Sequence, residues 1–421
     1  MSASTIVHDD TPAADRERGG LGEAFGNYIA RVRGGDVGSL PAVLGLVALV
    51  IVFSVLRPTR FTNAFNFANL IHQAAAVIVI AMGLVFVLLL GEIDLSAGFA
   101  AGTCAAVVGI VATRHGQPWP VAVLAGLATG LVIGFGIGIL VARLGIPSFV
   151  VSLAAFLGLQ GVLLKSIGSA GTIPIRNDVL IAVNNDNLPV WLGWLLFAGL
   201  VAGYALVTVR RSVSRRSKGL LAEPLSVGGS KIVVLALLLG AGTLYLSGER
   251  SPNSPASSIK GVPEVVALLA VLLLGLSFVL TKTAFGRHVY AVGGNAEAAR
   301  RSGINVPRIK LACFLINSSL AAVAGILIAS RDNSISPTTG GADTLLYAVG
   351  AAVIGGTSLF GGKGRVVDAI LGGLVIAVII NGMGLLNQES SVVFMVTGVV
   401  LLVAASVDAL SRRKAASTGR V

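Results

Sequence analysis

Charged residues are scarce in this chain. Lys, Arg, Asp and Glu make up 12% of its 421 residues, whereas soluble globular proteins carry roughly 25%. The mean hydropathy is +0.89, and the sequence holds many uncharged apolar runs of about 20 residues, the length that crosses a bilayer. The composition therefore excludes an ordinary soluble protein and predicts a polytopic membrane protein.

Groups that bind metals or act as nucleophiles are also few. The two cysteines, Cys104 and Cys313, both lie inside apolar segments, which predicts neither a disulfide framework nor a metal site. The four histidines are scattered along the chain. Because no His, Asp and Glu cluster or nucleophile constellation is present, we expect no metal, no cofactor and no enzymatic activity.

A nucleotide-binding loop is absent as well. The segment GGTSLFGGKG, residues 355–364, superficially resembles a phosphate-binding loop, which requires Gly-x4-Gly-Lys-Ser/Thr. Thr357 stands where the first glycine should be, and Gly364 follows Lys363 in place of the hydroxyl residue. The chain is therefore expected to have no ATPase of its own.

Glycine, in contrast, is abundant, with 54 residues at nearly twice the usual ~7%. Small residues let transmembrane helices pack closely. In the segment 355–364, glycines stand beside Lys363 and Arg365, which predicts either a tight turn at the cytoplasmic edge or the hinge of a gate. The glycines of this expected gate or hinge are Gly355, Gly356, Gly361, Gly362 and Gly364.

The apolar runs predict an all-α fold, a helical bundle of the inner membrane. About 12 hydrophobic segments can be drawn, of which about 10 to 12 are expected to be true spans. The shorter ones could be half-helices or re-entrant pieces. The predicted segments are 41–57, 69–90, 95–113, 119–142, 147–166, 190–209, 231–248, 263–281, 309–329, 344–360, 366–385 and 391–410.

Positive charge gives the orientation. The net charge is +12, and in a membrane protein Lys and Arg gather in cytoplasmic loops. The loops 210–231 and 282–310 are rich in both, as is the tail 411–421. With an even number of spans these segments share one side, so we expect both termini in the cytoplasm, a polar tail over 1–40 and a transmembrane domain over 41–410. The charge is thus explained without a nucleic-acid partner.

The longest informative loop runs from Ala284 to Lys310. Asn295 can cap a short helix whose first turn holds Glu297, and Gly303 can end that helix. Pro307 is expected to stop it before the next span. A connector of this length without a function is uncommon, so the loop 282–310 is the first candidate for a functional surface, with a plain solvated connector as the alternative.

Acidic residues in apolar sequence form the second candidate. In GEIDLSAG, residues 91–98, Asp94 can cap the helix that follows, and Asp343 can do the same for a later span. Two such helix starts could mark an inverted repeat, in which broken helices point at a transport site. Glu92 has no such simple explanation. Intramembrane carboxylates are functional candidates by default.

At this point the sequence resembles a known family. Glu297-Ala298-Ala299, followed after three residues by Gly303, matches the EAA loop of ABC-importer permeases. The longer pattern GxNxxAARxSGI, together with GEIDLSAG and GGTSLFGGKG, is similar to the ribose/xylose branch of sugar permeases. The resemblance covers about residues 40–410. Extra sequence near 210–262 is similar to the xylose subgroup, whereas the later Ile-x-Leu-Pro part of the EAA loop is not matched.

The resemblance implies a function. The protein would be the permease subunit of an ATP-driven importer of a monosaccharide, xylose or a related pentose, in the bacterial cytoplasmic membrane. Its partners would be a separate ABC ATPase that binds ATP, a periplasmic or lipid-anchored sugar-binding protein, and a second permease copy. The expected ATPase-coupling residues are Gly286, Arg287, Asn295, Glu297, Ala298, Ala299, Arg300, Ser302 and Gly303.

A neutral sugar needs uncharged polar groups along its path. The candidates in or beside spans are Asn66, Asn69, Gln73, Ser152, Gln160, Asn317 and Asn381, with Glu92 and Asp94 as the acidic ones. For each amide or hydroxyl, helix–helix hydrogen bonding is the alternative role. A proton-coupled secondary sugar transporter is the alternative function, and it would need a titratable group buried in the bundle.

Overall fold

The fold is all-α, as expected. The computed structural model describes residue 26 and residues 38–168, 171–219, 225–251 and 258–417, so the expected tail 1–40 lies almost entirely outside the described residues. Within them, ten apolar helices are long enough to cross a membrane. These are α5 (Ala64–Leu89), α6 (Ala97–Gly109) with its π-helical extension η1 (Ile110–Arg114), α7 (Trp119–Ala142), α8 (Ser148–Ile167), α10 (Val190–Arg216), α11 (Leu225–Ser247), α12 (Glu264–Lys282), α15 (Val306–Asp332), α17 (Val366–Leu385) and α18 (Ser390–Ser417).

The remaining elements are short. Two apolar helices are shorter than the ten, α3 (Leu40–Leu56) and α16 (Ala342–Gly355). The others are α4 (Pro58–Phe61), α9 (Asp178–Asn185), α13 (Ala284–Gly294), α14 (Ala296–Arg301) and the strands β1 (Ile173–Pro174) and β2 (Ser334–Ile335), which pair antiparallel.

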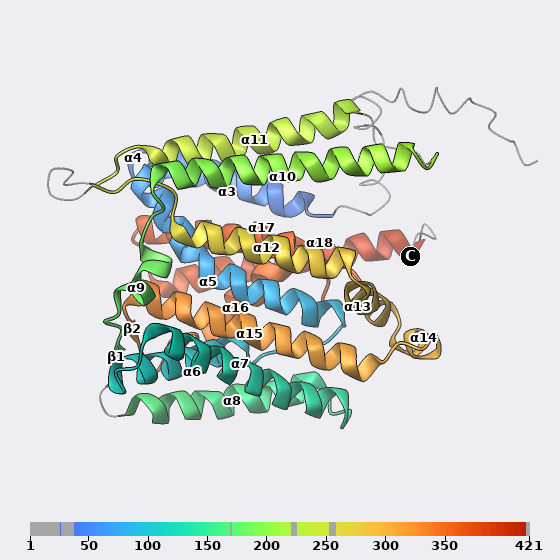
Figure 1. The fold of residues 1–421 in the computed structure, drawn as a ribbon, viewed down its shortest axis with the longest axis horizontal. Coiled ribbons are helices and arrows are strands. Elements are labelled where there is room, and N and C mark those ends of the chain that lie inside the picture. The colour runs from blue at the N-terminus through green and yellow to red at the C-terminus, as the bar shows by residue number, and fades with distance from the viewer. Residues whose placement is uncertain (1–25, 27–37, 169–170, 220–224, 252–257, 418–421) are drawn as a thin grey trace, which may run out of the picture.

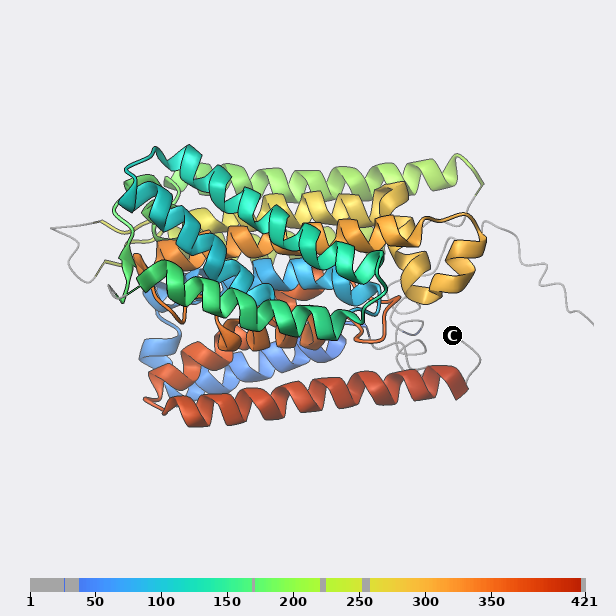
Figure 2. The same ribbon diagram turned by 90° about the horizontal axis from the view of Figure 1, so that it is seen from below.

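The long helices lie side by side with their axes roughly aligned, and α3 and α16 lie among them (Figures 1 and 2). The shortest helices and the two strands lie at the two ends of the bundle (Figure 1). One end carries α13 and α14 and is called the α14 end. The other carries α4, α9, β1 and β2 and is called the α9 end (Figure 1). Each end of the bundle thus has its own set of short surface elements.

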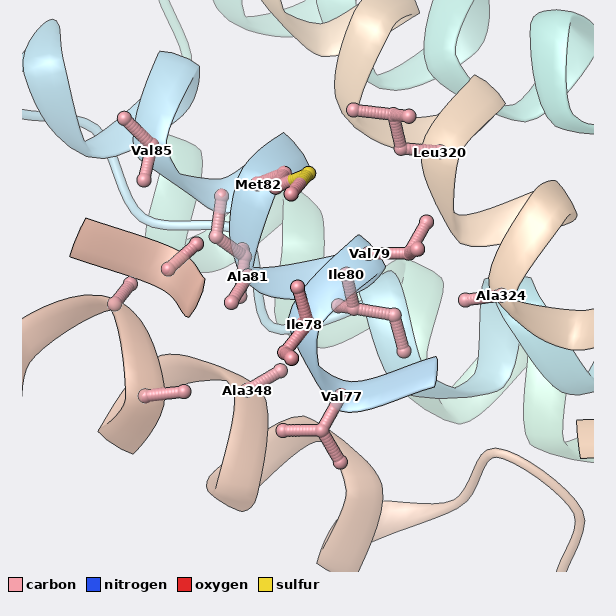
Figure 3. Close-up of a cluster of buried hydrophobic side chains, with 14 of the residues drawn as sticks. Val77, Ile78, Val79, Ile80, Ala81, Met82, Val85, Leu320, Ala324 and Ala348 are labelled. Atoms are coloured by element: carbon pink, nitrogen blue, oxygen red, sulfur yellow. The ribbon is translucent and has the colours of Figure 1, made fainter. Parts of the chain in front are cut away.

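Helix α5 forms the centre of the bundle. From Ala74 to Leu89 it is apolar on every side, a pattern typical of a helix buried all round, and Val79, Ile80 and Ala81 are fully buried. Leu320 and Ala324 of α15 and Ala348 of α16 surround it (Figure 3). Helices such as α10 and α11 instead expose large apolar side chains, as lipid-facing helices do.

The packing around α5 has a reciprocal form. A long helix, a short link and a shorter helix occur twice, as α5–α6 and as α15–α16, and the two long helices run in opposite directions (Figure 1). Helix α6 packs on α15 while α16 packs on α5, and α7 packs on α15 while α17 packs on α5. This arrangement agrees with the inverted repeat that the two acidic helix starts suggested.

Several local predictions need correction. The predicted span 344–360 is a 14-residue helix that ends at Gly355, because the glycine-rich segment after it turns back into α17. The loop 282–310 contains two helices rather than one, since α13 precedes α14, and Pro307 lies in the first turn of α15 instead of only ending α14. Helix α18 continues to Ser417, into the expected tail 411–421.

The prediction that Asp94 and Asp343 are helix N-caps is also wrong. The N-cap of α6 is Ser96, two residues beyond Asp94, and the Asp94 carboxylate accepts from the Ser96 backbone N–H at 2.8 Å. The N-cap of α16 is Gly341, and Asp343 lies in the first turn without a side-chain cap. Asp94 thus fixes the backbone just before α6, although it is not the N-cap. Asp343 interacts with the partial positive charge at the N-terminus of α16.

Candidate functional site

A polar cavity of about 430 Å³ lies toward the α9 end. The helices α5, α9, α15, α16 and α17 each contribute to its wall, so it sits among the most buried helices of the bundle. Its polar side chains are Asn66, Asn69, His72, Gln73, Asn184, Arg331, Asp332, Thr344, Tyr347 and Asn381.

One wall of the cavity is fixed by a pair of amides. Asn66 on α5 and Asn381 on α17 each donate to the other's side-chain oxygen at 2.9 Å, and Asn66 also donates to the Phe61 carbonyl at 3.0 Å. Both side chains are buried. Because each of the four side-chain polar atoms in this pair has a hydrogen-bond partner, the pair holds α5 against α17 at the cavity.

The opposite wall is fixed through α9. Asn184 is fully buried, and its side-chain amide donates to the Leu327 carbonyl at 3.1 Å. Its backbone N–H donates to the Ser330 hydroxyl at 3.0 Å. Its side-chain oxygen lies 3.4 Å from Nδ1 of His72. This network orients the His72 imidazole from behind and ties α5, α9 and α15 together.

Gln73 contributes a buried polar atom to the cavity wall. Its Oε1 is buried, and among the described residues it has no hydrogen-bond partner. A buried acceptor without a partner lowers the stability of the fold unless a ligand or a water molecule donates a hydrogen bond to it. Amide, imidazole and phenol groups that offer both donors and acceptors are suited to a neutral polyhydroxylated molecule.

A second hollow of about 490 Å³ adjoins this cavity, since Asn69 and His72 line both. The loop after α11 borders it with Arg250, whose buried guanidinium donates to the Gly261 carbonyl at 2.8 Å and to the Asn187 side chain. Burial lowers the pKa of Arg250. The second hollow therefore lies between the first cavity and the loop after α11 at the α9 end.

Only some of the predicted path residues line the cavity. Asn66, Asn69, Gln73 and Asn381 do, whereas Ser152, Gln160, Asn317, Glu92 and Asp94 do not. The sequence missed His72, Asn184 and Tyr347 because polar residues in apolar helices carry no motif, and only the tertiary fold brings them together.

Asp94 and Asn317 form a separate buried site. The Asp94 carboxylate accepts from the Ser96 hydroxyl at 2.6 Å and from the Asn317 amide at 2.7 Å, and it is 1% exposed. This arrangement ties the α5–α6 link to α15. Asp94 is therefore a structural acceptor here rather than part of the cavity.

Glu92 has a partner that the sequence did not suggest. Its carboxylate forms an ion pair with Lys310 in the second turn of α15, and both side chains are largely buried. The pair joins the α5–α6 link to the helix that directly follows α14. The charge left unexplained by the sequence is thus a contact at the α14 end.

The three sequence motifs meet at this same end. A methyl group at Gly293 would lie 1.8 Å from the Leu89 carbonyl oxygen, and one at Gly361 would lie 2.9 Å from the Gly293 oxygen and from the Gly91 nitrogen. The Gly362 N–H donates to the Leu89 carbonyl at 2.9 Å. Backbones of the loop 282–310, of GEIDLSAG and of GGTSLFGGKG are therefore in direct contact.

The glycine-rich segment itself is a tight turn between α16 and α17. Gly356, Gly361 and Gly362 have φ values of +117°, +84° and +73°, a region that residues with a side chain rarely adopt. Tyr290 on α13 donates to the Gly364 carbonyl at 2.7 Å. Gly355 instead packs against the start of α17, where a methyl group would lie 1.8 Å from the Asp368 oxygen.

The outer surface of the α14 end comes from α13 and α14. Asn295 caps α14 by accepting from the Ala298 N–H at 2.9 Å, and Gly303 ends the turn with φ of +86°. Arg300 and Arg301 form ion pairs with Glu297. The predicted positions that stay exposed are Arg287, Asn295, Glu297, Ala298, Arg300, Ser302 and Gly303, whereas Gly286 and Ala299 are buried.

Long apolar helices, an interior polar cavity at one end and an exposed pair of short helices at the other define a multi-pass membrane transport protein. The chain belongs to the family described as the permease component of branched-chain amino acid transport systems, whose family model matches residues 66–405. The resemblance that the motifs suggested is thereby confirmed.

Individual relatives are permease proteins rather than enzymes. The chain is 35% identical over 374 residues to the xylose transport system permease protein XylH of Escherichia coli, an alignment that covers 88% of this chain and 92% of XylH. It is 30% identical over 371 residues to the ribose import permease protein RbsC of E. coli, covering 87% and 92%, and 29% identical over 381 residues to the fructose import permease protein FrcC of Rhizobium meliloti, covering 90% and 88%. No solved structure matches the chain.

Proposed function

We propose that this protein is the permease subunit of an ATP-driven importer of a monosaccharide, xylose or a related pentose. The observation that carries the proposal is the cavity of donor and acceptor side chains, in a chain that is 35% identical to a xylose permease over 88% of its length. A pentose offers several hydroxyls, and polar groups of the kind contributed by Asn69, Gln73 and Tyr347 recognise hydroxyls by hydrogen bonding.

The two ends would have different partners. In the proposed arrangement the α9 end faces a sugar-binding protein outside the bacterial cytoplasmic membrane, and the α14 end faces a separate ABC ATPase in the cytoplasm. Both chain termini then lie in the cytoplasm, in keeping with the basic segments near Arg210 and Arg300. A second copy of the permease completes the path.

We further propose that α13 and α14 pass the ATPase movement to the centre of the bundle. The support is the backbone contact of Gly293 with Leu89 and Gly361, because a shift of α13 must displace the end of α5 and the α16–α17 turn together. The turn would act as a hinge at Gly356, Gly361 and Gly362, whose backbones are held in a conformation that glycine tolerates.

The first test is reconstitution in liposomes. Protein with its ATPase and its binding protein is expected to import radiolabelled xylose only when ATP is present on the ATPase side. Ribose and fructose uptake would be measured in parallel to define the sugar. Uptake driven by a proton gradient in the absence of the ATPase would instead support the alternative, a secondary transporter. In that alternative, Asp332 in the cavity wall would be the candidate proton-binding carboxylate.

The second test addresses the coupling surface. Glu297→Lys removes the ion pairs with Arg300 and Arg301, and Gly303→Pro demands a negative φ where the chain has +86°. Both variants are expected to lose ATPase binding in a pull-down from detergent solution and to lose uptake. Glu249→Lys makes the same charge change at the α9 end and is the control for ATPase binding, which it should retain. Unchanged ATPase binding by both test variants would refute the coupling role of α14.

A further inference from the structure

The hairpin of α10 and α11 lies on the outside of the bundle (Figure 1). From Val190 to Val209, α10 carries no charged residue, and these residues span about 30 Å, the thickness of the hydrocarbon core. Trp191 is exposed at the start of this stretch, the usual position of aromatic residues at a membrane interface. Arg211 and Arg215 therefore lie at the level of the lipid headgroups of the opposite leaflet.

A cavity of about 590 Å³ opens at this level between the two helices. Arg211 and Arg215 are four residues apart and share one face of α10, and Lys231 lines the cavity from α11. Gly228 and Gly229 form part of the α11 wall, and a methyl group at Gly229 would have no neighbour within 4 Å. Because the glycines have no side chains, they leave space in the part of the cavity that the three cations also line.

The lining of this cavity is suited to an anion. None of the described residues that line it is a carboxylate. The Ser212 hydroxyl lines it too, is buried, and has no hydrogen-bond partner within the described part of the chain. The first turns of α11 add the partial positive charge of a helix N-terminus. Cations, a hydroxyl and a helix start together form a typical phosphate-binding environment.

The geometry points to a binding site for the phosphate ester of an anionic phospholipid, held between α10 and α11. A lipid fits better than free phosphate because Val207, Val209 and Ile232 form the apolar part of the wall, and exposed apolar side chains such as Leu237 and Leu238 continue along α11. Basic pockets between transmembrane helices are known to bind lipid headgroups. The site fixes the hairpin to the membrane and does not depend on the sugar that is transported.

The test measures lipid binding to the full chain in detergent. Delipidated protein is titrated with phosphatidylglycerol, phosphatidylcholine or inorganic phosphate, and bound lipid is counted by native mass spectrometry while the thermal unfolding midpoint is recorded. Phosphatidylglycerol is expected to bind and to raise the midpoint. Arg211→Gln and Arg215→Gln are each expected to weaken this binding about fivefold, the effect of ~1 kcal/mol per basic residue.

Two further variants separate the site from general charge. Arg210→Gln removes the neighbouring exposed arginine, which does not line the cavity, and it should bind phosphatidylglycerol like the unchanged protein. Arg211→Lys keeps the charge and should retain most of the affinity. Equal losses in Arg210→Gln and Arg211→Gln, equal stabilisation by phosphatidylcholine, or equal stabilisation by inorganic phosphate would each overturn the proposal.

Discussion

The two ends of the bundle differ in how they are built. At the α14 end, three segments far apart in the sequence meet through backbone atoms of Gly293, Leu89 and Gly361, and a methyl group at Gly293 would not fit. At the α9 end, side chains from five helices leave a cavity of about 430 Å³ between them. The recognisable motifs thus mark the closely packed end, whereas the polar cavity carries no motif.

The largest effect is expected from Gly293→Val at the packed end. Its side chain would overlap the Leu89 carbonyl, and overpacking of this kind typically costs about 1–3 kcal/mol. We expect loss of ATP-dependent uptake and a lower thermal unfolding midpoint in detergent. Gly294→Val is the matched control, because no atom lies within 4 Å of a methyl group there. Similar losses in both variants would show that the close contact of Gly293 with Leu89 is not the cause of the loss.

A comparable loss of stability is expected when the ion pair of the packed end is broken. Glu92→Gln leaves Lys310 largely buried without its carboxylate, at a cost of about 1–3 kcal/mol. Lys310→Met should cost a similar amount, and the double variant should be more stable than the sum of the two losses predicts. Unfolding midpoints of the three variants give the coupling. Strictly additive losses would mean that the pair contributes nothing.

At the cavity end, Gln73→Leu should change transport more than stability. It removes a buried acceptor that has no partner among the described residues, so the fold loses no hydrogen bond. If that acceptor binds the sugar, uptake should fall about tenfold, the value of one hydrogen bond of about 1.4 kcal/mol. Gln160→Leu, outside the cavity, is the control and should import normally. Normal uptake by Gln73→Leu would remove Gln73 from the path.

The smallest effect concerns the loop after α11. Hydrogen bonds from the Ser258 hydroxyl and from the Ser251 and Ile259 N–H groups lower the pKa of Glu249 to about 2. Because the folded pKa lies below the ordinary 4.5, this stabilisation is present above about pH 4.5 and is lost as the pH falls toward 2. A carboxyl NMR titration should therefore show Glu249 ionised at pH 4. A titration midpoint near 4.5 would contradict these loop contacts.

The difference between local and long-range contacts explains which features could be predicted from the sequence. Apolar runs predicted the spans, and the Asn295 cap and the Gly303 stop were confirmed, because these features depend on neighbours in sequence. The pairing of Glu92 with Lys310 spans 218 residues and could not be read from either motif. Asn66 and Gln73, chosen as polar residues in a span, line the cavity, whereas Gln160 and Asn317 looked the same in sequence and lie elsewhere.

The most direct test measures sugar imported and ATP hydrolysed in the same liposomes, for the unchanged protein, Gln73→Leu and Glu297→Lys. If the α9 end carries the sugar path and the α14 end the coupling surface, Gln73→Leu keeps ATPase binding and lowers the sugar imported per ATP hydrolysed. Glu297→Lys should lose ATPase binding and lower import and transport-coupled hydrolysis together. Import that continues without the ATPase, or an unchanged ratio in Gln73→Leu, would contradict this division of roles between the two ends.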